Sequence, residues 1–165
     1  MKNINDIYIL IEKENIILEE VNFRQRNIEG IYFKVPGLSP TIGIHKNIVS
    51  DTKKYISILA EELGHHFTSI GNLSAECITY TQKLNRSKQE RRARMWAANY
   101  LISDEEINGA ILQNICSIYA LSIHFNVTEE IIKYKLLSIY LKEDKYNNIK
   151  ISIRNKEVAY DCCNL

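Results

Sequence analysis

The sequence predicts an α+β fold, with a small three-stranded sheet beside one long helix and a helical C-terminal half. Apolar, β-branched runs lie within positions 16–45, whereas apolar residues recur at helical spacing from Ile56 onward. Further along, Ser103-Asp104-Glu105-Glu106 is a capping box that begins another helix. At 165 residues, of which 45% are hydrophobic, the chain can bury one core. We therefore expect residues 1–165 to form a single domain.

The elements before position 50 follow from short patterns. A first amphipathic helix is marked by four residues at helical spacing: Ile4, Ile7, Tyr8 and Ile11. Three strands are expected after it, over Ile16 to Phe23, Gly30 to Val35 and Thr41 to His45. The segment 36–40 has a proline at each end, which predicts a loop between the last two strands. Ser50 or Asp51 can then cap the long helix.

The long helix is predicted to have one apolar face and one polar face. Its apolar stripe is formed by Ile56, Leu59, Ala60, Leu63, Phe67 and Ile70, and Gly71 is placed to end the helix. Glu61 and His65 fall nearly opposite this stripe, so we expect them to face a cleft or solvent. Gly64 costs about 1 kcal/mol in a helix interior, so another segment is expected to approach it closely.

Residues 60–66, Ala-Glu-Glu-Leu-Gly-His-His, differ by one residue from the H-E-x-x-H helix of zinc peptidases. In that motif two ligands at i and i+4 share a helical face, and the intervening Glu activates a metal-bound water. Glu61 takes the first ligand position here, His65 the second, and Glu62 that of the general base. Carboxylate oxygen is an accepted zinc ligand. The alternative is a surface helix with an ordinary Glu-to-His pair.

A third ligand is expected from the segment 87–98. Glu90 lines up with Ala93, Ala97 and Leu101 on a helical wheel, so it projects from a buried side. A carboxylate there needs a charged partner or a metal, and a Glu from a second helix completes a glutamate-zincin site. The alternative is a capping box, in which Ser87 begins the helix and Glu90 folds back on its amide.

These segments resemble the ImmA/IrrE metallopeptidases of phages and mobile elements. The resemblance rests on residues 58–68, and on Glu90-x-x-Ala93 followed by residues 96–102, which are similar to the family's H-E-L-G-H helix and its E-x-x-A-N-x-F-A-x-x-L-L segment. It implies that Glu61, His65 and Glu90 hold a divalent metal and that Glu62 is the general base. Two residues depart from the family: Glu61 stands where His is usual, and Arg94 where Asn is usual.

The function predicted from these residues is that of a cytoplasmic metal-dependent endopeptidase in which Glu62 activates a metal-bound water. The expected metal is Zn²⁺, and a ligand set with two carboxylates and one imidazole also tolerates Mn²⁺ or Fe²⁺. The resemblance implies that the substrate is a repressor protein of a phage or mobile element. Two alternatives stay open: a non-catalytic, metal-binding antirepressor that binds the same partner, and a DNA-binding regulator.

The DNA-binding alternative rests on a helix-turn-helix pattern over about residues 115–142, with Thr128 as the N-cap of its second helix. Lys133 and Lys135 could contact phosphates there. Glu129 and Glu130 begin the same helix and would repel phosphate, and the family resemblance favours a scaffold or partner-docking role for this segment.

Overall composition gives little support to nucleic-acid or membrane binding. The net charge is +1, and no apolar run approaches the length needed to cross a bilayer. The basic run over residues 83–94 is interpreted as a solvated helix face. The cysteines, at positions 77, 116, 162 and 163, lack C-x-x-C spacing and are expected to be reduced thiols. Tyr80 and Tyr100 could stabilise an oxyanion.

Overall fold

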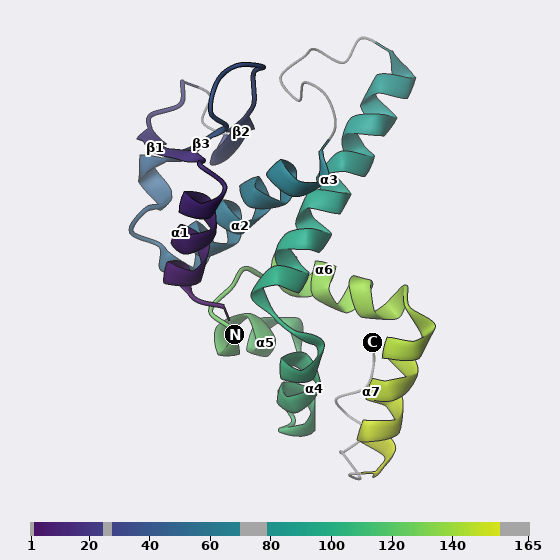
Figure 1. Cartoon of the computed structure of the whole chain (residues 1–165). Coiled ribbons are helices and arrows are strands. Elements are labelled where there is room, and N and C mark those ends of the chain that lie inside the picture. The colour runs from purple at the N-terminus through teal and green to yellow at the C-terminus, as the bar shows by residue number, and fades with distance from the viewer. Residues whose placement is uncertain (1, 25–27, 70–78, 156–165) are drawn as a thin grey trace.

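The computed structural model describes residues 2–24, 28–69 and 79–155 and confirms the predicted α+β class. In these ranges three strands are followed by a helical C-terminal half, as Figure 1 shows. The elements are α1 (Ile4–Lys13), β1 (Ile17–Val21), β2 (Gly30–Phe33), β3 (Thr41–His45), the 3-10 helix η1 (Lys46–Ile48), α2 (Thr52–Thr68), α3 (Tyr80–Leu101), α4 (Asp104–Leu112), α5 (Ile118–His124), α6 (Glu129–Tyr140) and α7 (Glu143–Asn155).

The sheet has the strand order β1-β3-β2. β3 pairs with β1 in parallel and with β2 in antiparallel fashion, and its residues Ile42 and Ile44 are fully buried. The prediction for Thr41 to His45 is confirmed to the residue, whereas the two outer strands are shorter than the predicted runs. Since β3 is central, β1 and β2 are the edges of this sheet.

Helix α2 lies between the sheet and α3, as Figure 1 shows, and contacts both. It begins after Asp51, whose side chain accepts a hydrogen bond from the Lys54 amide, so Asp51 rather than Ser50 is the cap. The helix ends at Thr68, and Ile70 and Gly71 lie outside the described residues.

The face of α2 opposite the sheet is covered by α3. Glu61 is partly buried and His65 is only 5% exposed, so neither side chain faces open solvent. A helical wheel gives the angle of a side chain relative to the apolar stripe, but it does not show what packs on the other face. The expected close approach at Gly64 is confirmed, because an ideal Cβ there would lie 2.3 Å from the carbonyl oxygen of Ala93.

Helix α3 starts well before the predicted position. Its N-cap is Thr79, and the capping box is formed by Thr79 and Gln82. Ser87 therefore lies in the interior of the helix, and the alternative in which Ser87 and Glu90 form the capping box was wrong. Glu90 therefore does not cap the helix, and its partner lies across the interface with α2.

The C-terminal half confirms the capping box at the start of α4, where Ser103 and Glu106 exchange hydrogen bonds. Helices α5 and α6 follow as a helix-turn-helix, with Asn126 at a positive φ of 48° in the turn. None of the helices in the described residues has the length and apolar character needed to cross a membrane.

Lys135 on α6, one of the two lysines considered for phosphate contacts in the DNA-binding alternative, is not available for them. Its side chain is 1% exposed, and its Nζ donates to Asp104 Oδ1 at 2.7 Å and to Asn99 Oδ1 at 2.9 Å. The lysine stem packs into the core and its charge is paired, so Lys135 connects α6 to α3 and to the start of α4.

Candidate metal centre

Helix α2 contributes two of the three predicted ligands, Glu61 and His65, one helical turn apart. Both ring nitrogens of His65 have a partner. Its Nδ1 lies 3.0 Å from the hydroxyl oxygen of Ser69, and its Nε2 lies 3.3 Å from Glu90 Oε2. A partner on one ring nitrogen fixes the direction of the other, which is the usual arrangement around a metal-binding histidine.

Helix α3 contributes Glu90, with Ala93 and Ala97 buried on the same side. One ligand atom from each of Glu61, His65 and Glu90 lies within 4.8 Å of the others. Donors about 2.1 Å from a tetrahedral cation are about 3.4 Å apart, so small side-chain movements would bring these three into contact with one ion. Two carboxylates and one imidazole fit a divalent cation.

The site concentrates negative charge in partly buried surroundings. Burial raises the pKa of Glu61 although Arg94 opposes the shift, and burial raises the pKa of Glu62 to about 8. The hydrogen bond with His65 lowers the pKa of Glu90. Burial alone would lower the pKa of His65, but Glu90 and Glu62 outweigh it and the pKa is raised. A bound cation would stabilise the ionised carboxylates of this cluster.

Glu62, the predicted general base, lies on a different side of α2 from the three convergent donors. It is 8% exposed and faces the edge strand β2. An ideal Cβ on Gly30 would be 2.6 Å from Glu62 Oε1, and the backbone amide of Tyr32 donates to the Glu62 carboxylate. Glycine at position 30 therefore leaves the space that this carboxylate occupies.

Arg94 joins the site, although sequence reasoning gave it only as a departure from the family segment and as part of the basic run. Its Nε donates to Glu61 Oε1 at 2.7 Å, and its Nη1 forms an ion pair with Glu130 Oε1 at 2.9 Å. The two departures from the family pattern, Glu61 and Arg94, are thus in direct contact. A signal for this was present in the sequence, because Arg94 follows Glu90 by four residues and shares its helical face.

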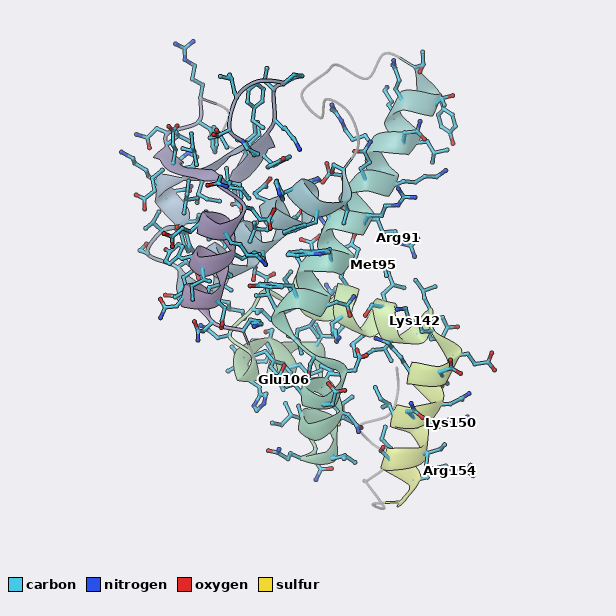
Figure 2. All side chains as sticks on the ribbon, viewed as in Figure 1. Arg91, Met95, Glu106, Lys142, Lys150 and Arg154 are labelled. Carbon is cyan, nitrogen blue, oxygen red and sulfur yellow. The ribbon has the colours of Figure 1, made fainter. Side chains whose placement is uncertain are left out.

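The other basic residues of α3 mostly match the expected solvated face. Lys83, Lys88, Arg91 and Arg92 are exposed. Figure 2 shows Arg91 projecting from α3 on the side away from the sheet.

The two tyrosines considered as oxyanion stabilisers do not lie at this site. Tyr80 and Tyr100 are each ten residues from Glu90 on α3, which is about 15 Å along the helix axis. Tyr80 is 80% exposed, and the Tyr100 hydroxyl donates to the Asp6 carbonyl at 3.0 Å. That hypothesis was wrong.

His66, which follows the second ligand, belongs to a separate network. Its Nδ1 lies 3.0 Å from the Tyr32 hydroxyl and its Nε2 lies 3.4 Å from Glu14 Oε2. Of the four cysteines, Cys116 places its sulfur 3.8 Å from the Ile111 carbonyl oxygen. The other three, at positions 77, 162 and 163, lie outside the described residues.

Most of the chain matches the model of a known family. The Peptidase M78 model, described as an IrrE N-terminal-like domain, matches residues 11–137. This range contains the sheet, α2, α3 and the first nine residues of α6, and it includes Glu61, Glu62, His65, Glu90 and Arg94. No curated protein and no solved structure matches the chain.

Proposed function

Because the chain belongs to the Peptidase M78 family, with its IrrE N-terminal-like domain over residues 11–137, we propose that it is a metal-dependent endopeptidase. The observation that carries this proposal is the convergence of Glu61, His65 and Glu90 within 4.8 Å, with Glu62 next to the first of them on α2. The helical spacing is that of the H-E-x-x-H zinc peptidases, with Glu61 as a carboxylate ligand in place of the first His.

In this proposal Glu61, His65 and Glu90 hold one divalent cation. Zn²⁺ is the expected ion, and the two carboxylates also suit Mn²⁺ or Fe²⁺. When bound, the cation would polarise the scissile carbonyl and acidify a water. Ser69 keeps the His65 ring oriented through Nδ1, so that Nε2 stays directed toward Glu90.

Glu62 is the general base of the proposed reaction. Its carboxylate accepts a proton from the attacking water and donates it to the leaving nitrogen. Burial against β2 raises the pKa of Glu62 to about 8, and a cation bound beside it would stabilise the ionised form that accepts the proton. The Tyr32 amide holds the carboxylate in place beside the strand.

The edge strand β2 is the proposed docking site for an extended substrate. Within the described residues, β2 pairs with β3 on one side and has no strand partner on its outer edge, where a peptide would add as a further strand. Gly30 and Tyr32 of β2 border Glu62, so a peptide added to this strand would run past the general base. We propose a repressor protein of a phage or mobile element as the substrate, following the family resemblance.

An antirepressor that binds its partner without cleaving it is the second candidate. The observation in its favour is that Arg94 already donates to Glu61, which places a fixed positive charge next to the proposed cation site.

The substitution Glu62→Gln separates the two candidates. It preserves shape and the three proposed ligands but removes the proton acceptor, so cleavage should fall about 10²-fold or more while metal content is unchanged. The assay combines the protein with the repressor encoded beside its gene, with fragments measured by mass spectrometry and derepression by a reporter. Glu12→Gln, an exposed change on α1, is the matched control. Equal derepression by the native protein and Glu62→Gln, with no fragments, would establish the antirepressor.

A further inference from the structure

Arg94 is held in a fixed position by groups on two other helices. Glu61 of α2 accepts a hydrogen bond from Nε at 2.7 Å, and Glu130 of α6 forms an ion pair with Arg94, with Oε1 2.9 Å from Nη1. The ring of Tyr134, one turn after Glu130, lies 5.8 Å from the guanidinium carbon. The guanidinium is a planar group with donors in several directions, so contacts on both sides determine its orientation.

The contact with Glu61 changes the charge balance of the proposed metal site. Glu61 and Glu90 bring two carboxylates toward His65, whereas two histidines and one Glu would bring only one. The guanidinium of Arg94 offsets the additional negative charge. A carboxylate has two oxygens, so Glu61 can accept from Arg94 through Oε1 and still offer its second oxygen to a cation.

We propose that Arg94 is a positioning residue that makes Glu61 a competent metal ligand, and that α6, through Glu130 and Tyr134, forms part of the support of the metal site. The inference rests on the proposed metal site and assigns a new role to a residue outside the three ligands. The opposite possibility is that Arg94 competes with the cation for Glu61 and so weakens metal binding. The two possibilities predict changes of metal affinity in opposite directions when Arg94 is removed.

The test is a titration of Zn²⁺ and Mn²⁺ against a competing chelator, with the full chain. Arg94→Ala should weaken metal binding about 10- to 100-fold, as loss of a residue that orients a ligand generally does. Arg94→Lys keeps the charge but lacks the fork geometry, so it should recover part of the loss. Arg91→Ala, an exposed change one turn earlier on α3, should leave the affinity unchanged.

The decisive comparison is the same substitution in a Glu61→His background. With imidazole as the first ligand there is no carboxylate for Arg94 to position, so Arg94→Ala should no longer weaken binding. A role of Arg94 in general folding would instead produce the same loss in both backgrounds. Circular dichroism monitors folding, and Glu130→Gln provides a milder variant, with a smaller loss of affinity, if Arg94→Ala unfolds.

The outcomes of the titration separate failure of the role proposed for Arg94 from failure of the proposed function. Unchanged or tighter metal binding by Arg94→Ala in the native background, or an equal loss in both backgrounds, overturns the role of Arg94 and leaves the proposed function standing. A native protein that binds neither metal overturns the proposed function and this inference with it.

Discussion

The carbonyl oxygen of Ala93 in α3 lies 2.3 Å from the position that a Cβ atom on Gly64 of α2 would occupy. Glycine is therefore the residue that allows the two helix backbones to approach this closely. Gly64 directly precedes His65, and Ala93 follows Glu90 by three residues, so the same approach brings these two side chains together.

The first prediction concerns this contact. Gly64→Ala should destabilise the protein by about 1–3 kcal/mol, because overpacking outweighs the gain of about 1 kcal/mol in helix propensity. Metal binding should weaken as well, since α3 is displaced from α2. Urea unfolding and the chelator titration measure both effects. Gly109→Ala is the control, because nothing lies within 4 Å of a Cβ there, and it should be neutral or stabilising.

The second prediction concerns Glu90. Glu90→Ala should remove the bound metal from the purified protein and leave the helical content unchanged, because Glu90 lies in the interior of α3 and does not cap it. Elemental analysis and circular dichroism give the two readouts. Ser87→Ala, also inside α3, should keep full metal. Retention of metal by Glu90→Ala would show that the ion binds elsewhere.

The third prediction separates positioning of the general base from metal binding. A Cβ at position 30 would lie 2.6 Å from Glu62 Oε1 and 2.6 Å from Ile58 Cγ2, so Gly30→Ala must move the Glu62 carboxylate. Cleavage of the repressor should fall about 10-fold or more, whereas metal affinity should change little. Full activity in Gly30→Ala would argue against Glu62 as the base.

The fourth prediction compares two lysines of α6. Lys135→Met should cost about 1–3 kcal/mol of unfolding free energy, because Asn99 and Asp104 lose a buried hydrogen-bond donor. Lys133→Met should change the free energy of unfolding by no more than about 0.5 kcal/mol, since Lys133 is exposed and its ion pair is with Glu129 one turn away. Chemical unfolding of both variants measures the difference. Equal effects would contradict the buried position of Lys135.

The fifth prediction is a pH dependence that arises from Asp104. Burial alone would raise the pKa of Asp104, but hydrogen bonds from Lys135 and Lys145 outweigh it and the pKa is lowered. A lowered folded-state pKa stabilises the protein above the unfolded value of about 3.9, and this stabilisation is lost as the pH falls through the folded value. Asp104→Asn should therefore have a lower free energy of unfolding than the native protein at about pH 6. The difference in free energy between the two proteins should become smaller below about pH 4.

Local periodicity was sufficient to predict much of the fold and part of the site. The stripe that includes Leu59 and Leu63 specifies α2, and the i, i+4 spacing puts Glu61 and His65 on one face of it. Gly64 signalled the close approach of another segment, because a glycine in a helix interior is costly unless packing requires it. These features depend on residues within a few turns of each other, where helix geometry alone determines direction.

Tertiary structure decided which distant groups meet. The contact of Arg94 with Glu61 joins residues 33 positions apart, and the burial of Lys135 depends on Asp104, 31 positions away. The start of α3 at Tyr80 and the position of β2 at a sheet edge also followed from the assembled structure. Spacing along one helix fixes the direction of a side chain, but its partner depends on how separate elements pack.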